Sequence, residues 1–253
     1  MDIVYSLTCH ENPLSLIDLI KNIQYFNRNL KICIIVHAND YMFSELKGKV
    51  EHLNPIHYNR SAFTVGFFKS QIENFDYAVS KGIDMTYFIP LASNCYFHKP
   101  VELDYIKSLL DNSPSPIPFK QVGWHWSKIL QNKKINLNIG QLYPFQHEGF
   151  ILPKQIAQQI SEHVRIHDIY NNIECETVFE EYLFASLYAK LTGKQPQTIC
   201  KAFWDLPNIT PSLEEIINCE SPSVKRVSRD YNNAIRVHFR KITNNYDLEY
   251  TQI

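Results

Sequence analysis

The sequence predicts an α/β protein with a mostly parallel sheet flanked by helices. Two observations predict this class. Short segments rich in apolar and β-branched residues, such as 3–7, 31–37 and 86–92, alternate along the chain with longer amphipathic segments. These short segments are largely apolar, as expected of parallel strands that helices cover on both faces.

The elements of the first half alternate between strand and helix. Pro13 is well placed to open the first helix, because proline already has a helical φ and its missing N–H is not needed in the first turn. The predicted elements are a strand at 3–7, a helix from 13, a strand at 31–37, a short helix at 42–49, a strand at 55–59, a helix at 66–81 and a strand at 86–92.

A connector with three prolines, NSPSPIPF at 112–119, follows the first half. We interpret the chain as one domain, 1–253, whose halves 1–111 and 120–253 meet at this connector. In the second half, 146–160 predicts a strand that leads into a helix. The segment 174–193 has the clearest helical pattern in the chain and ends at Gly193, and 221–229 is expected to be a strand or loop with clustered cations.

Composition excludes several classes of protein. The formal net charge is −1 at pH 7, so no basic excess indicates a nucleic-acid partner. The six cysteines form no C-x-x-C pair, and we expect reduced thiols. Since the N-terminal segment has no signal-peptide pattern and no apolar run is long enough to span a bilayer, we expect a cytoplasmic protein. Peripheral association with a membrane would need a partner or a surface patch.

Polar side chains follow three of the predicted strands. In open α/β sheets ligands bind beyond the carboxyl ends of parallel strands, so these side chains are candidates for binding a donor nucleotide. An isolated histidine at a strand end is nevertheless more often structural. The candidates are His10 after the first strand, His37, Asn39 and Asp40 after the second, and Ser93 and Asn94 after 86–92.

The charged candidates for a functional site are three cations and two carboxylates, and no sequence pattern indicates a metal site beside them. The chain has no D-x-D pair, and Asn94 and Cys95 are poor ligands for a hard cation, so we predict no metal and no other cofactor. Lys225, Arg226 and Arg229 lie within five residues and are able to hold a diphosphate, although on spacing alone a solvated charged face is the better explanation. Glu180 and Glu181 are expected about 100° apart on the 174–193 helix, so one could face a cleft while the other faces solvent. The helix pattern alone favours a surface position for both.

Seven segments occur in an order that resembles the family 14 glycosyltransferases, the core-2/I-branching and xylosyltransferase-like enzymes. The resemblance covers roughly residues 3–230, and no single motif is specific. Two departures are that S-N-C replaces the family's G-x-D and that Val65 replaces a tryptophan. The segments are IVYSLTCHENPLSLIDLIKNI from 3, IIVHAND at 34–40, FTVGFFKS at 63–70, TYFIPLASNCYF at 86–97, HEGFILPKQI at 147–156, FEEYLFASL at 179–187 and VKRVSRD at 224–230.

The resemblance implies a GT-A-like, Rossmann-type fold and an inverting, metal-independent glycosyltransferase of polysaccharide biosynthesis. The donor would be a nucleotide sugar, with UDP expected because the family uses it, and the acceptor a glycan or lipid-linked glycan. Glu181 aligns with the family's general base. Lys225, Arg226 or Arg229 would balance the diphosphate charge. Glu148, Trp124 and Trp126 would contact the acceptor, although a core or lid role explains the tryptophans equally well. The alternative is a non-catalytic carbohydrate-binding or scaffold protein that retains the fold, which the S-N-C replacement favours.

Overall fold

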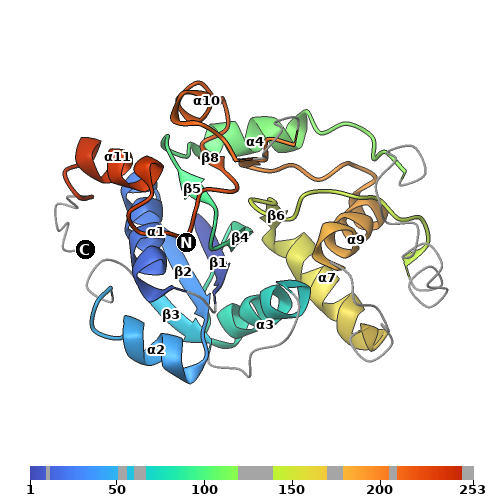
Figure 1. The fold of residues 1–253 in the computed structure, drawn as a ribbon. Helices are drawn as coiled ribbons and strands as arrows, with labels where there is room; N and C mark the ends of the chain where they lie inside the picture. Colours follow the sequence, from blue (N-terminus) through green and yellow to red (C-terminus); the bar gives the residue numbers. More distant parts are fainter. Residues whose placement is uncertain are drawn as a thin grey trace.

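A mixed five-stranded sheet forms the centre of the molecule (Figure 1). The computed structural model describes residues 1–9, 12–50, 56–59, 67–118, 139–169, 179–204 and 210–246. The strand order is β3-β2-β1-β4-β6, and every neighbouring pair is parallel except β4 and β6. The predicted α/β class with a mostly parallel sheet is therefore confirmed. The strands are β1 (Ile3–Thr8), β2 (Ile32–His37), β3 (Ile56–Asn59), β4 (Tyr87–Ala92) and β6 (Leu152–Pro153).

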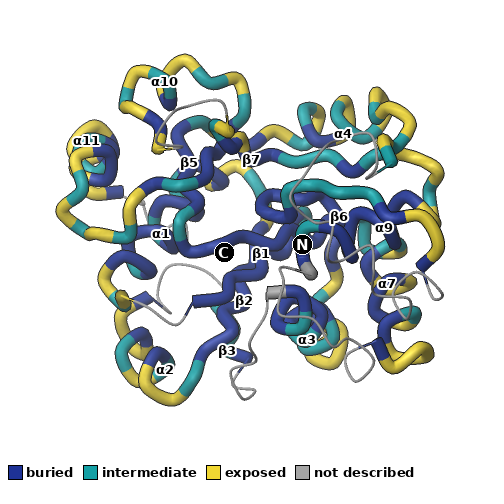
Figure 2. Tube along the Cα trace, turned by 45° about the vertical axis from the view of Figure 1, so that its right-hand side comes forward, coloured by how far each residue is buried: buried dark blue, intermediate teal, exposed yellow. Residues whose placement is uncertain are grey.

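Helices cover both faces of this sheet and enclose two apolar cores. In β1, Tyr5 and Leu7 face one core while Val4 faces the other, because successive side chains of a strand point to opposite faces. Figure 2 shows the buried strands inside a shell of helices with exposed outer sides. On the Tyr5 side lie α1 (Pro13–Phe26), α2 (Asp40–Leu46), α4 (Leu103–Asp111), α10 (Leu213–Ile217) and α11 (Ala234–Ile242); on the other lie α3 (Phe67–Ser80), α7 (Lys154–Ile166) and α9 (Leu183–Thr192).

A second, smaller sheet joins distant parts of the chain. Its order is β5-β8-β7, with β8 antiparallel to β5 and parallel to β7. These strands are β5 (Tyr96–Phe97), β7 (Cys200–Lys201) and β8 (Ser223–Val224). Because β5 follows β4 closely, this pairing brings the basic segment after β8 to the carboxyl end of β4.

Two element predictions need correction. The predicted helix 174–193 is not continuous: a 3₁₀ turn, η2 (Phe179–Glu181), precedes α9, and residues 170–178 lie outside the described part. The predicted strand at the start of 146–160 is only the two residues of β6. The helix ends as predicted at Gly193, whose φ of 69° caps α9.

The described residues include most of the cysteines and the helices named above. Five cysteines are free thiols, and Cys175 lies outside the described residues. Within the described ranges, no helix combines the length and the apolar character needed to cross a membrane.

Candidate active site

The loop before β6 places Glu148 inside the protein. The Gly149 N–H donates to the Pro90 carbonyl (2.8 Å), and the Gly149 carbonyl accepts from the Ile199 N–H (3.0 Å). Gly149 has a φ of 72°, and a Cβ on it would lie 2.5 Å from Cys200 Cβ. Only glycine fits between these two segments, so the glycine of the sequence HEGF determines where Glu148 lies.

Glu148 and Lys225 form a buried ion pair. Lys225 Nζ lies 2.5 Å from Glu148 Oε1, and the two side chains are 11% and 3% exposed. The backbone N–H of Lys225 donates to the Lys201 carbonyl (2.8 Å), which fixes the start of the basic segment. Removing either charge would leave the other buried and unpaired, which is strongly destabilising. The structure thus brings together two residues that the sequence assigned to different substrates.

His147 and Glu148 differ in charge at neutral pH. Burial lowers the pKa of His147 to about 4, so its ring is neutral at pH 7. Burial would raise the pKa of Glu148, but His147 and Lys225 outweigh it and hold that pKa below its ordinary value. With His147 neutral, Lys225 is the partner that keeps Glu148 ionised. Glu148 Oε2 lies 3.5 Å from His147 Nδ1. Among the described residues, none donates a hydrogen bond to Glu148 Oε2.

Glu180 and Glu181 lie beside this pair, on the 3₁₀ turn η2. The Glu181 carbonyl accepts from the Phe145 N–H (2.7 Å), which joins η2 to the Glu148 loop. Glu180 is buried and Glu181 is half-buried. A 3₁₀ turn has three residues per turn, so neighbouring side chains diverge by about 120° rather than the expected 100°. Neither carboxylate belongs to a solvated helix face.

The environment raises the pKa of both carboxyl groups. Burial, with the negative charges of Glu181 and Glu148, raises the pKa of Glu180 to about 7. Burial also raises the pKa of Glu181; Lys225 and Arg226 oppose that rise, and Glu148 adds to it. These electrostatic effects place Glu148, Glu180, Glu181, Lys225 and Arg226 in one charged cluster. A carboxylate with a raised pKa is a better proton acceptor than an ordinary one.

Trp204 lies next to the two cations of the cluster. Arg226 Cζ is 4.4 Å and Lys225 Nζ is 5.6 Å from the centroid of its ring, and the residue is 44% exposed. Arg226 Nε is buried, and no described residue accepts a hydrogen bond from it. The ring also lines a cavity of about 350 Å³, together with Phe145, Gln146, Thr198 and Cys200. Sequence reasoning missed Trp204, because the only signal was a third tryptophan in the chain.

Arg229, Ser93 and Asn94 also meet. Arg229 Nε donates to Ser93 Oγ (2.7 Å), and the Val227 N–H donates to the Asn94 carbonyl (3.1 Å). The cationic segment therefore runs along the turn that follows β4. Three of the predicted donor-binding residues share this edge, although no described contact links Arg229 with Glu148 or Lys225.

His37 ends β2, and Asn39 and Asp40 begin α2. His37 is fully buried, with Nδ1 3.9 Å from Glu73 Oε2. The Asn39 side chain caps α2 by accepting from the Met42 N–H (2.8 Å), and Asp40 is an exposed residue in the first turn. Their predicted role in nucleotide binding stays a prediction. His10, Trp124 and Trp126 lie outside the described residues. Across the described ranges, no three histidine, cysteine, aspartate or glutamate side chains gather as a metal site.

Comparison with known proteins finds similarity in structure but not in sequence. No family model matches the chain, and no curated protein does. A crystal structure of the galactosyltransferase LgtC with donor and acceptor sugar analogues is 12% identical, with a TM-score of 0.44 over 98% of this chain and 97% of that chain. An active-site mutant of LgtC is 13% identical, with a TM-score of 0.46 over 96% of this chain and 95% of that chain.

Proposed function

We propose that the protein is an inverting glycosyltransferase that moves a sugar from a nucleotide donor to a hydroxyl of a glycan. The observation that carries the proposal is the charged cluster. It combines a half-buried carboxylate with a raised pKa, Glu181, with two cations, Lys225 and Arg226, beside the Trp204 cavity. Such a transfer needs a base for the acceptor hydroxyl and positive charge for the departing diphosphate.

In this proposal Glu181 acts on the acceptor. Its carboxylate takes the hydroxyl proton as the acceptor oxygen forms a bond to the anomeric carbon. The bond from that carbon to the diphosphate oxygen breaks on the opposite face, and its electron pair leaves with the diphosphate. The configuration at the anomeric carbon is therefore inverted.

Lys225 and Arg226 balance the charge that develops on the leaving diphosphate. Arg226 is the stronger candidate for direct contact, since its buried Nε finds no acceptor among the described residues. Glu148 holds Lys225 through Oε1 and leaves Oε2 for an acceptor hydroxyl. In this mechanism the protein's own cations take the place of a metal ion, and no other cofactor takes part.

The exposed Trp204 ring is suited to stack against an acceptor sugar. Aromatic faces bury the apolar face of a sugar ring while its hydroxyls remain available for hydrogen bonds. Gln146 and Thr198 supply polar groups to the same cavity. A non-catalytic carbohydrate-binding protein would use this cavity equally well, and it is the second candidate function.

Replacing Glu181 tests the catalytic proposal directly. Glu181→Gln keeps the size of the side chain but cannot accept the proton, so we expect turnover to fall about 10²–10⁴-fold while donor binding is retained. Glu180→Gln is the matched control, because it changes the neighbouring carboxyl, which the proposed mechanism does not use, and should keep most of the turnover. Equal turnover in both variants would remove Glu181 as the base.

The donor must be identified before that assay. Thermal-shift measurements against UDP-, GDP-, CMP- and dTDP-sugars select it, and the transfer assay is then repeated in EDTA. We expect activity to persist in EDTA; a loss restored by added metal would overturn the metal-independent mechanism. Calorimetry that detects glycan binding but no nucleoside diphosphate binding would favour the non-catalytic alternative.

A further inference from the structure

The segment that carries the cations is held at both of its ends. At one end β8 pairs with β5 and β7. In its middle the Val227 N–H donates to the Asn94 carbonyl (3.1 Å). At the other end the Ser228 carbonyl accepts from Arg236 Nε (2.7 Å). Lys225 and Arg226 lie between β8 and Ser228, and Arg229 follows Ser228 directly. The positions of these three cations therefore depend on the attachments.

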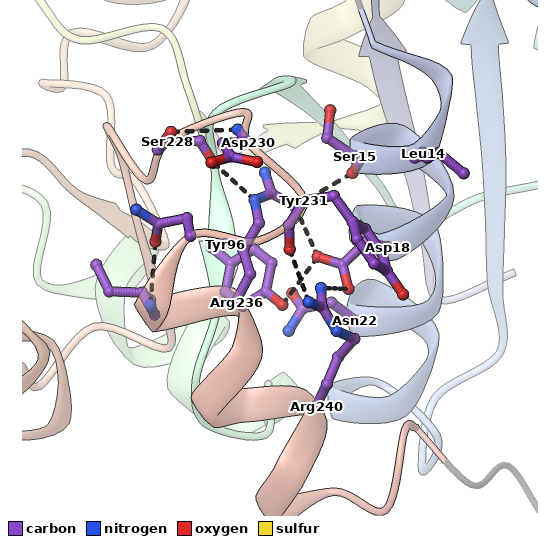
Figure 3. Close-up of polar contacts among 12 residues, drawn as sticks. Leu14, Ser15, Asp18, Asn22, Tyr96, Ser228, Asp230, Tyr231, Arg236 and Arg240 are labelled. Carbon is purple, nitrogen blue, oxygen red and sulfur yellow. Dashed lines mark hydrogen bonds and ion pairs between the residues drawn. The ribbon is translucent and has the colours of Figure 1, made fainter.

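Arg236 is fully buried and connects this segment to the first turn of α1 (Figure 3) and to the turn that follows β4. Besides Ser228, its guanidinium donates from Nη1 to the Ser15 carbonyl (3.1 Å) and from Nη2 to the Ser93 carbonyl (3.5 Å). Ser15 lies in the first turn of α1, which follows β1, and Ser93 follows β4. The Ser93 hydroxyl also accepts a hydrogen bond from Arg229 Nε, so Arg236 and Arg229 both donate to Ser93.

Asp18 neutralises Arg236 and a second arginine. Asp18 Oδ2 accepts from Arg236 Nη1 (2.7 Å), and Oδ1 accepts from Arg240 Nη1 (2.9 Å). The Arg240 side chain also contacts Tyr231: its Nη2 donates to the Tyr231 carbonyl (2.6 Å), and its guanidinium stacks on the Tyr231 ring. The two arginines therefore share one carboxylate, and among the described contacts it is Arg236 that donates a hydrogen bond to the Ser228 backbone.

The backbone of the held segment is strained. Arg226 has a φ of 75°, in the left-handed region that residues other than glycine rarely adopt. Such a conformation persists only where the surrounding structure enforces it, and it concentrates at functional sites. The attachments on both sides of Arg226 supply that constraint.

We propose that Arg236 is a positioning residue for the diphosphate site, holding the 225–229 segment in its strained conformation so that its cations converge on one ligand. The inference rests on the proposed function for the identity of the ligand, but not for the positioning itself. Arg236 does not touch the substrate in this scheme.

The test compares Arg236→Lys with Arg240→Lys. Each variant keeps one positive charge near Asp18 and loses the geometry of a guanidinium, but only Arg236→Lys removes the bond to Ser228. Amide hydrogen exchange in the intact protein follows Val227, whose N–H lies inside the held segment. Binding of UDP, GDP and inorganic pyrophosphate is measured by calorimetry on the same samples.

We expect faster Val227 exchange and about tenfold weaker pyrophosphate or nucleoside diphosphate binding in Arg236→Lys, with both unchanged in Arg240→Lys. Unchanged exchange in Arg236→Lys, or equal acceleration in both variants, overturns the positioning role. Failure of the wild-type protein to bind any of the three ligands counts against the proposed function alone, because the exchange comparison still decides the positioning. If Arg236→Lys does not fold, Asp18→Asn replaces it, because it weakens the hold on Arg236 while keeping one acceptor oxygen. Since Asp18 also binds Arg240, Val227 exchange faster than in Arg240→Lys is then the result that supports the positioning role, and exchange equal to that of Arg240→Lys overturns it.

Discussion

Gly149 is the single residue on which the geometry of the charged cluster depends most directly. Its backbone has a φ of 72°, and a Cβ would lie 2.5 Å from Cys200 Cβ and 2.7 Å from Thr198 Oγ1. Gly149→Ala therefore combines backbone strain with a steric clash, and we expect it to lower the free energy of unfolding by about 2–4 kcal/mol and to displace Glu148. Urea denaturation measures the stability.

Gly140→Ala is the matched control for this change. Gly140 also has a positive φ, 83°, but nothing lies within 4 Å of the place its Cβ would take. That variant should cost only the backbone strain, about 1 kcal/mol. If the two alanine variants are equally stable, the close approach of Gly149 to Cys200 does not constrain the loop.

Glu180 makes stability depend on pH in an unusual direction. Its pKa rises from 4.5 to about 7 on folding, chiefly through burial. Between these values the folded protein binds more protons than the unfolded chain, so its stability falls as the pH rises. Glu180→Gln removes this titration. We expect it to have little effect at pH 4.5 and to stabilise the protein by up to about 3 kcal/mol above pH 7.

Urea denaturation of both proteins across pH 4.5–8 checks this prediction. Glu215→Gln is a control of opposite sign, because hydrogen bonds with Ser212 at the start of α10 lower the pKa of Glu215. That variant should lose stability relative to the wild type as the pH rises toward 4.5, so its series starts at about pH 3. A difference between Glu180→Gln and the wild type that does not change with pH would contradict burial of an uncharged Glu180.

At the scale of elements, the pattern of apolar residues predicted the strands whose formation depends mainly on their own sequence. The runs at 3–7, 31–37 and 86–92 became β1, β2 and β4, because an apolar β-branched run has few alternatives to a buried strand. The predicted helix 174–193 was wrong at residues 179–182, the first part of it that the structure describes. There the chain forms η2, whose Glu181 carbonyl is bonded to the Phe145 N–H of the Glu148 loop. Tertiary contact overrode the helical pattern.

The small sheet and the Arg236 contacts had no local signal. Strands of two residues, such as β5, β7 and β8, are too short to show a periodicity. Asp18 and Arg236 are separated by 218 positions, and a buried arginine in an amphipathic helix cannot be told from a solvated one without the fold. The sequence therefore predicted Glu181, Glu148 and the three cations as site residues, but it gave no indication of the residues that hold them in place.

At the scale of the whole molecule, the halves on either side of the proline-rich connector interlock. β4 of the first half pairs with β6 of the second, and β5 pairs with β8. Each of the two cores contains residues from both halves, such as Ile3 with Tyr246 and Val4 with Tyr188. Neither half could keep its buried surface without the other, although chains of this length often unfold through intermediates.

We therefore expect the protein to unfold in a single transition, and the tryptophans offer a sharp test. All three, at 124, 126 and 204, lie in the 120–253 half. Ile34→Val removes one buried methylene from β2 in the first half and should cost about 1 kcal/mol. In urea, the midpoint by tryptophan fluorescence should shift as far as the midpoint by circular dichroism, because the second half loses its core when the first half opens. A shift seen by circular dichroism alone would mean that the halves unfold independently and that the shared cores do not couple them.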